Sequence, residues 1–285
     1  MISNKHLDMK TCEVYRSLMA KDFKYIPLTK LGEGTFGQVM FAGGRHEEER
    51  ALKFIHYEDA EDKSRRIDSE VEIHQELSKH PHIVTYVETL HDEGAKVEAI
   101  VMHKMHQSLD QYMRKIFREG KVMQEELVWR ISGQIAETLA YMHQQPGTIL
   151  HRDLKPDNIL LTDDLEVRLS DFGLARRIDD PKNRHRGLSC EVGTYFYMSP
   201  EVYNSDMYNE KSDVFSLGVC MYIMVSGRNP FYVEGEDEVK VWDEETKRCI
   251  ENTRQVLKCK NKAPPKFMRC SESLKNLIMD MISPL

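Results

Sequence analysis

The sequence predicts an α+β protein of two lobes: a small N-terminal lobe with a five-stranded antiparallel sheet and one helix, and a larger, mainly helical C-terminal lobe. Three observations predict this fold. The chain has 285 residues, enough for two medium-sized domains or one large bilobal one. Residues 23–102 read as short apolar strands with one helical stripe. From residue 106 onward, apolar side chains recur mainly at helical spacing.

The small lobe is expected to follow a polar, irregular N-terminal extension, residues 1–22. Its first two strands are predicted in KYIPLTKLGEGTFGQVMFAGG, where glycines join them. The other three strands are predicted in ERALKFIHY, HIVTYVETL and KVEAIVMH. Between ERALKFIHY and HIVTYVETL, residues 62–78 place apolar side chains at approximately helical spacing, which predicts the single helix of this lobe.

The large lobe is predicted to contain helices over residues 124–143 and 271–282, because their apolar side chains recur at helical spacing. Residues 211–226 are strongly apolar, as expected of a helix at the centre of a helical lobe. No internal repeat or low-complexity linker interrupts the chain.

Composition is typical of soluble globular proteins, with 40% hydrophobic and 31% charged residues. No segment approaches the roughly 18 apolar residues of a membrane-spanning helix, and the first ten residues lack the apolar run of a secretory signal. The six cysteines are scattered, which disfavours a zinc site or a disulfide framework. The net charge of −7 argues against nucleic-acid binding. We therefore expect a cytoplasmic or nuclear monomer with neither nucleic-acid nor membrane partners.

A glycine-rich segment, LGEGTFGQV, places Gly32, Gly34 and Gly37 before Val39. Glycines at such spacing let backbone N–H groups approach phosphate oxygens closely. An isolated match of this kind is as often an ordinary hairpin turn. The segment differs from a dinucleotide-binding fingerprint, which opens directly into a helix, because strands are predicted on both sides of it.

The next strand carries Lys53 between apolar neighbours. A lysine in such a place is normally a solvated edge residue, but after a glycine loop its ammonium group could contact phosphate oxygens. Its ammonium group then needs a carboxylate from the predicted helix. Counting back from the turn KHPHIV favours Glu70, with Glu72 as the alternative.

The most specific string is HRDLKPDNILL, residues 151–161, and with it the chain resembles the eukaryotic protein kinase family from about residue 25 to the end. The resemblance implies a kinase domain over residues 23–285. In this loop Asp153 would accept or orient the substrate hydroxyl, and Lys155 would neutralise charge on the transferring phosphoryl group. Asn158 would supply an oxygen ligand to Mg²⁺. Tyrosine-specific kinases usually lack this lysine, so the resemblance favours serine/threonine acceptors.

Thirteen residues after Asn158, the string Asp171-Phe172-Gly173 matches the family's metal-binding DFG motif. Asp171 would hold the Mg²⁺ that bridges the ATP phosphates. Asp213 matches the family aspartate that anchors the catalytic loop backbone. The resemblance assigns a set of residues to ATP binding: Leu31, Gly32, Gly34, Gly37, Val39, Ala51, Lys53, Met102, His103, Met105 and Leu160.

Regulatory residues are expected between the DFG motif and Ser199-Pro200-Glu201, which stands where the family has Ala-Pro-Glu. Arg152 would pair with a phosphate in this segment, placed by an upstream kinase or by autophosphorylation. Ser189 is the candidate acceptor, although an ordinary loop serine is as good a reading. Thr194 would shape the substrate site near the catalytic loop.

Three departures from the family pattern stand out. His74 takes a place where the family has an apolar residue in a buried column with Tyr86, His151 and Phe172. Ser108 takes the place of an acidic companion of Asp157, so we expect at most a mild preference for arginine before the acceptor. The chain ends before the family's arginine partner of Glu201, so we expect a truncated or unusual C-terminal end.

The residues and the resemblance together predict a serine/threonine protein kinase that uses ATP and Mg²⁺ and acts on protein substrates in intracellular signalling or the cell cycle. A pseudokinase scaffold is the alternative, but it predicts the loss of a catalytic group, and none is lost. A small-molecule kinase would lack the Ser-Pro-Glu segment. YMSPE and YNEKSD resemble NIMA-related kinases, whereas PHIV resembles calmodulin-dependent kinases, so the subgroup stays open.

Overall fold

The computed structural model describes residues 25–34, 37–44, 49–178, 197–199, 202, 208–230 and 270–282. The chain divides into two compact units, residues 1–105 and residues 106–285. We call them the N-unit and the C-unit. In the part of the chain that the structure describes, no helix is long and apolar enough to cross a membrane.

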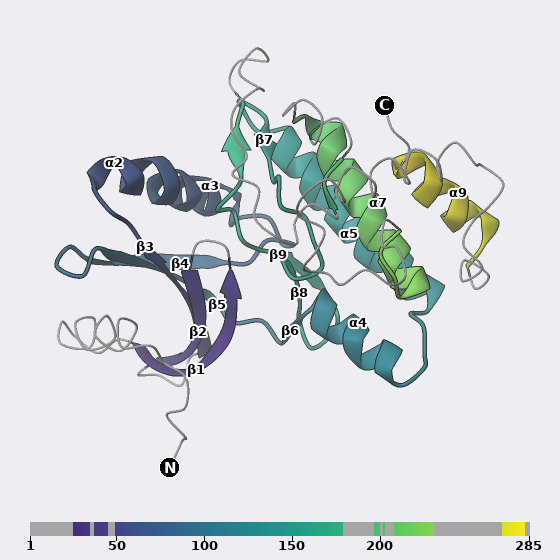
Figure 1. Ribbon diagram of the computed structural model, residues 1–285, viewed down its shortest axis with the longest axis horizontal. Helices are drawn as coiled ribbons and strands as arrows, with labels where there is room; N and C mark the ends of the chain where they lie inside the picture. Colours follow the sequence, from purple (N-terminus) through teal and green to yellow (C-terminus); the bar gives the residue numbers. More distant parts are fainter. Residues whose placement is uncertain are drawn as a thin grey trace, which may run out of the picture. The chain divides into compact units, whose positions relative to one another are not determined.

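The N-unit contains a five-stranded antiparallel sheet, which confirms the predicted sheet (Figure 1). Its strands are β1 Tyr25–Gly34, β2 Gly37–Gly44, β3 Glu49–His56, β4 Tyr86–Asp92 and β5 Val97–His103. They lie in the order β1-β2-β3-β5-β4. The central place of β3 puts Lys53 between two neighbouring strands.

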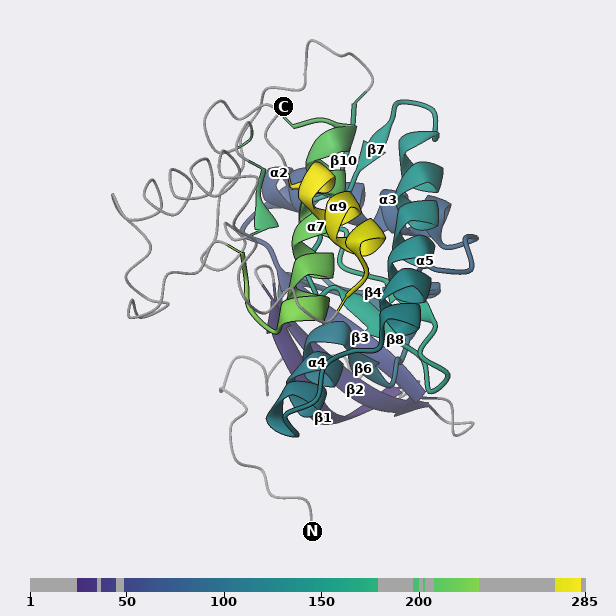
Figure 2. The ribbon, with the colours of Figure 1, turned by 90° about the vertical axis from the view of Figure 1, so that its right-hand side faces the viewer.

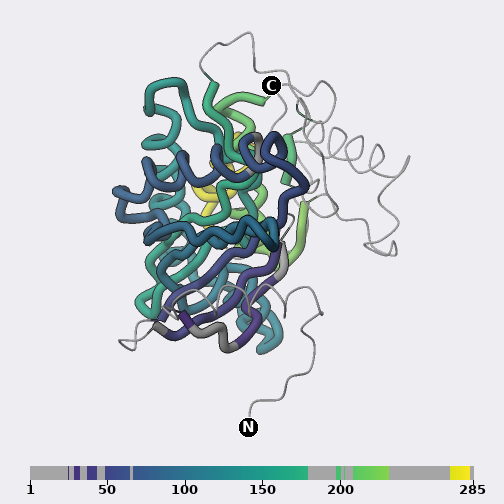
Figure 3. The backbone as a smooth tube through the Cα atoms, turned by 90° about the vertical axis from the view of Figure 1, so that its left-hand side faces the viewer, coloured from purple at the N-terminus to yellow at the C-terminus, as the bar shows by residue number. Residues whose placement is uncertain are grey.

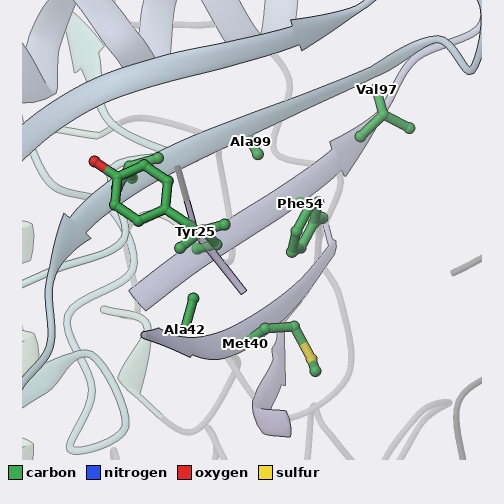
Figure 4. Packing of buried hydrophobic residues seen from close by; sticks show 8 residues of the cluster. Tyr25, Met40, Ala42, Phe54, Val97 and Ala99 are labelled. Carbon is green, nitrogen blue, oxygen red and sulfur yellow. The ribbon is translucent and has the colours of Figure 1, made fainter. Parts of the chain in front are cut away.

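One face of this sheet carries a buried apolar cluster to which four of the five strands contribute (Figure 4). Its members alternate along each strand, as expected when one face of a sheet is buried: Tyr25, Met40, Ala42, Leu52, Phe54, Val97, Ala99 and Val101. Alternation along β3 therefore directs Lys53 to the opposite face from Leu52 and Phe54.

The predicted single helix of the N-unit is a run of three helical segments: α2 Ala60–Lys63, the π-helical η1 Ser64–Asp68 and α3 Ser69–Leu77 (Figures 1 and 3). The change from α to π geometry within the run is the difference from the prediction, since apolar spacing indicates a helix but not its hydrogen-bond register. After η1, the buried positions of α3 follow a regular stripe: Glu70, Ile73, His74 and Leu77.

The C-unit contains four described helices of seven residues or more: α4 Leu109–Arg118, α5 Glu125–His143, α7 Glu210–Ser226 and α9 Glu272–Met281 (Figure 2). The last three match the predicted helices to within one residue at each end. Short strands surround the catalytic loop: β6 Gln107–Ser108, β7 Ile149–Leu150, β8 Ile159–Leu161, β9 Val167–Leu169 and β10 Arg176–Arg177.

Helix α7 is the central helix of the C-unit and packs against both α5 and α9 (Figure 2). Asn209 caps its N-terminus with a side chain that accepts a hydrogen bond from the Lys211 amide. At Gly218 an added Cβ would lie only 2.8 Å from Met281 Cβ and from a methyl group of Ile282. The close approach of α7 to the end of α9 therefore depends on this glycine.

Candidate active site

The N-unit contributes a buried ion pair. Lys53 Nζ on β3 lies 2.6 Å from Glu70 Oε1 on α3, and both side chains are about 95% buried. Glu72 is exposed, so Glu70 is the helical carboxylate that faces the lysine, as the sequence favoured. Burying two charges costs desolvation energy that an apolar pair would avoid. The pair is therefore better explained by a need to fix an ammonium group than by stability.

The glycine-rich segment forms the ends of β1 and β2, which pair from Gly32↔Val39 to Gly34↔Gly37. At Gly37 an added Cβ would lie 1.7 Å from the carbonyl oxygen of Phe54, so the pairing of β2 with β3 requires a glycine. At Gly32, by contrast, an added Cβ would meet no atom within 4 Å. Packing does not explain Gly32, whereas a backbone that phosphate oxygens approach does.

Three of the residues predicted to line the ATP site, Val39, Ala51 and Met102, lie on neighbouring strands of the sheet. Ala51 on β3 lies opposite Met102 on β5, and Val39 on β2 lies opposite Lys53. The N–H group of His103 donates to the carbonyl of Thr85 at 3.0 Å, so this N–H is not available to a nucleotide. The exposed Leu31 lies on β1, Met105 follows β5, and Leu160 lies on β8 in the C-unit.

The catalytic loop of the C-unit lies between β7 and β8. Asp153 Oδ2 accepts hydrogen bonds from Lys155 Nζ at 2.8 Å and from Asn158 Nδ2 at 2.9 Å. Asn158 Nδ2 also donates to the main-chain carbonyl of Asp153 at 2.8 Å. These two bonds orient the Asn158 amide, so its oxygen is directed away from Asp153 and suits a cation.

His151 links this loop to the DFG motif. Its Nδ1 accepts a hydrogen bond from the Asp153 amide at 3.2 Å, so Nε2 carries the proton and donates to the Ser170 carbonyl at 3.2 Å. Its ring also packs against Phe172, with centroids 5.5 Å apart. With both nitrogens engaged in structural contacts, His151 is a poor candidate for a general base.

Asp213 anchors the loop from α7. Its Oδ2 accepts from the His151 amide at 3.0 Å and from His143 Nε2 at 2.8 Å. Its Oδ1 accepts from the Arg152 amide at 3.0 Å and from the Tyr208 hydroxyl at 3.2 Å. Burial opposes ionisation of Asp213, but the hydrogen bonds from His143 and from the Arg152 amide, with the nearby histidines, hold its pKa below the ordinary value.

Two site residues, Arg152 and Asp171, have left-handed backbones, with φ of +68° and +63°. Such backbone angles are strained for residues other than glycine, and they recur at functional sites. The strain at Arg152 is offset by the hydrogen bonds that the His151 and Arg152 amides donate to Asp213. Near the second, the Ser170 amide and hydroxyl both donate to the Asn158 carbonyl, at 3.0 and 2.9 Å, which fixes the start of the DFG motif against the catalytic loop.

Asn158 and Asp171 carry hard oxygen atoms of the kind that Mg²⁺ prefers. Among the described residues, no group of three or more His, Cys, Asp or Glu side chains could hold a metal ion alone. One amide oxygen and one carboxylate fit Mg²⁺, which takes most of its ligands from phosphates and water in phosphoryl-transfer sites.

Arg152 lies over the ring of Tyr208, with its guanidinium carbon 5.6 Å from the ring centroid. Tyr208 is thus held between Arg152 and Asp213, and sequence reasoning missed it, together with His143. The predicted Ser189 and Thr194, and Glu201 of the Ser-Pro-Glu segment, lie outside the described residues. Two residues before the Ser-Pro-Glu segment, the carbonyl of Tyr197 accepts a 2.7 Å hydrogen bond from the Ser216 hydroxyl on α7.

Sequence reasoning also missed the acidic residue Asp110. Ser108, which takes the place of the expected acidic companion of Asp157, caps α4 and accepts a hydrogen bond from the Gln111 amide. Asp110 in the first turn of α4 bonds through its amide to the Pro156 carbonyl at 3.2 Å. Although Asp157 is exposed as a residue, partial burial of its carboxyl group and the nearby charge of Asp110 raise its pKa.

Comparison with known proteins agrees with this geometry. The family described as "Protein kinase domain" matches residues 25–284. The probable serine/threonine-protein kinase nek2 of Dictyostelium discoideum is 38% identical over 213 residues, which are 73% of this chain and 50% of that protein. Mouse serine/threonine-protein kinase PLK2 is 34% identical, with 74% of this chain and 28% of that protein covered. Human Nek2 is 37% identical over 60% of this chain and 38% of its own length. The chain thus spans half or less of the length of these relatives.

Proposed function

Because the chain belongs to the protein kinase family, we propose that it transfers the γ-phosphate of ATP to serine or threonine hydroxyls of protein substrates. The family as a whole implies ATP and a divalent metal, and we propose Mg²⁺ as that metal. The observation that carries the proposal is the Asp153–Lys155–Asn158 network, anchored by Asp213. The named serine/threonine kinases among its relatives support the choice of acceptor.

The residues described above have distinct roles in this reaction. Lys53, fixed by Glu70, binds phosphate oxygens of ATP, and Asp153 orients the acceptor hydroxyl and takes its proton. A bond forms between the acceptor oxygen and the γ-phosphorus while the bond to the β-phosphate oxygen breaks. Lys155 neutralises charge on the phosphoryl group as it moves. Asn158 and Asp171 would hold Mg²⁺, which would neutralise charge on the phosphates.

Substrate preference is proposed to include a basic residue near the acceptor. The carboxylates of Asp110 and Asp157 are close enough for one to raise the pKa of the other. A lysine or arginine side chain would relieve that repulsion. Arg114 already pairs with Asp110, its Nε 2.6 Å from Oδ2, which limits the preference to a mild one.

The remaining assignments are also proposals. We propose that the residues assigned to ATP binding by the sequence contact adenine and phosphate as predicted. The exception is the N–H of His103, which donates to the Thr85 carbonyl. Arg152, supported by Tyr208, would bind a phosphate placed on Ser189 by autophosphorylation or by an upstream kinase. Thr194 would shape the substrate site. We further propose a kinase domain over residues 23–285 after an extension, a monomeric state, and a cytoplasmic or nuclear location.

The test is to incubate the purified chain with Mg-ATP and with myelin basic protein or casein, beside an Asp153→Asn variant. Loss of the base should lower the rate by about 10²- to 10⁴-fold. Mass spectrometry should find phosphoserine or phosphothreonine, and a site at Ser189 would support activation by phosphorylation. ATP binding without transfer in either protein would favour the pseudokinase alternative.

A further inference from the structure

The buried stripe of α3 contains two polar side chains, Glu70 and His74, separated by one helical turn. Glu70 has a role in the proposed reaction, but His74 has none. His74 is only 2% exposed, in a place where an apolar side chain was expected. Burying an imidazole costs free energy unless its polar atoms are hydrogen-bonded, so the contacts of His74 need a reason.

His74 fastens α3 to the residues that lead into β4. Its Nε2 lies 2.8 Å from the Val84 carbonyl, and because a carbonyl only accepts, Nε2 carries the proton and donates. The His74 ring meets the Tyr86 ring edge to face, with centroids 5.7 Å apart. Just beyond α3, the Tyr86 amide donates to Ser78 Oγ at 2.7 Å. The C-terminal end of α3 is thus held by directional contacts.

These contacts matter because of the π-helical segment η1 upstream. Lys63 Nζ lies 2.8 Å from the buried Glu98 and fixes α2 to β5, but this contact lies before η1. A π turn adds one residue to the helix, and one residue corresponds to about 100° of rotation in an α-helix. The rotation of α3 therefore depends on contacts after η1. A change of one residue in that register would turn Glu70 away and direct a neighbouring side chain, Ser69 or Val71, toward Lys53.

We propose that His74 is a positioning residue: its hydrogen bond to the Val84 carbonyl fixes the rotation of α3 and so holds Glu70 against Lys53. An apolar side chain would pack in the same place, but hydrophobic contact is non-directional and would not oppose rotation as well. The geometry rests on the N-unit alone, and only the kinetic consequence rests on the proposed function.

Two variants separate the hydrogen bond from packing. His74→Leu keeps a buried side chain but removes the donor, whereas His74→Gln keeps an N–H donor. For His74→Leu we expect amide hydrogen exchange in residues 69–77 to be about ten-fold faster and kcat about ten-fold lower, from the loss of one buried hydrogen bond. The KM for the acceptor protein should stay within about two-fold, and His74→Gln should restore most of both losses.

A double-mutant cycle tests whether His74 acts through Glu70. Glu70→Gln removes the charge that holds Lys53, so adding His74→Leu to it should lower kcat no further. Glu72→Gln is the matched control, because it makes the same chemical change at an exposed position of the same helix. We expect this control to leave both kcat and exchange at the wild-type level.

The proposal is overturned if His74→Leu has the amide exchange and kcat of wild type, or if His74→Gln restores neither quantity. It is also overturned if the losses of kcat caused by Glu70→Gln and His74→Leu are additive. A wild-type chain that transfers no phosphate would refute the proposed function instead. Amide exchange in residues 69–77 would then still test whether the His74 hydrogen bond fixes α3. Faster exchange in His74→Leu with recovery in His74→Gln supports that role, and unchanged exchange refutes it.

Discussion

The two units hold their chemical groups in different ways. In the C-unit, Asp153 lies in a network whose members fix one another, and Asp213 alone accepts four hydrogen bonds from the loop and its neighbours. In the N-unit, the pairing of Lys53 with Glu70 depends on the position of a helix that contains a π-helical segment. The catalytic loop is therefore organised locally, whereas the ion pair depends on the surrounding scaffold. Changes in activity are expected to arise more easily in the N-unit.

The largest effect on stability is expected where the N-unit scaffold leaves no room. Gly37→Ala would place a Cβ against the Phe54 carbonyl and force β2 from β3, which should lower the free energy of unfolding by about 4 kcal/mol. Gly32→Ala is the matched control, since its Cβ would meet nothing. The control should stay within about 0.5 kcal/mol in urea unfolding while raising the KM for ATP. Equal stability of the two variants would contradict the conclusion that the pairing of β2 with β3 requires a glycine at position 37.

Asp213→Asn tests how much the hydrogen bonds to Asp213 stabilise the C-unit. The variant keeps the shape but removes a buried charge that accepts four hydrogen bonds, and we expect a loss of about 3 kcal/mol in the free energy of unfolding at pH 7. Because the folded pKa of Asp213 lies below its ordinary value, its contribution is present above an ordinary pKa of about 4 and is lost below it.

Urea unfolding of wild type and Asp213→Asn between pH 7 and pH 3 checks this sign. The difference in stability should be constant down to about pH 4.5 and should shrink as the pH falls further. A difference that grows with acidification would mean that the pKa of Asp213 is raised in the folded protein.

How far the sequence could predict the molecule is seen in the same two units. Apolar patterns located α5, α7 and α9 to within a residue, because burial of one face is a local pattern, but they did not predict α4. They missed η1, because a π turn changes hydrogen-bond register without changing composition. They also missed His143 and Asp110, whose partners Asp213 and Asp157 lie many residues away and are brought near only by the fold. Counting along one helix was enough to favour Glu70, since that choice is local.

Glu70→Gln should affect activity more than stability. Without its charged partner the Lys53 ammonium is less well fixed, and we expect kcat to fall by roughly ten- to a hundred-fold. The amide still accepts a hydrogen bond, so the free energy of unfolding should fall by only about 1–2 kcal/mol. Steady-state kinetics and urea unfolding on one preparation give both values. A stability loss as large as that of Asp213→Asn would remove the contrast between the units.

The smallest expected effect is a gain in stability. Ser132 on α5 is buried, and among the described residues its hydroxyl has no hydrogen-bond partner. Ser132→Ala removes that hydroxyl and introduces a better helix former, so we expect the free energy of unfolding to rise by about 0.5–1 kcal/mol. Thermal unfolding by circular dichroism would show the rise, and a lower Tm would indicate that the hydroxyl has a partner.

The contrast between the two units is tested most directly by native-state hydrogen exchange of the wild-type chain without nucleotide. The amides of His151 and Arg152, which donate to Asp213, should exchange more slowly than those of residues 69–77 in α3. Added Mg-ATP should then slow exchange in α3 far more than in the catalytic loop. Faster exchange at His151 and Arg152 than in α3 would contradict the conclusion that the catalytic loop is the part organised in advance.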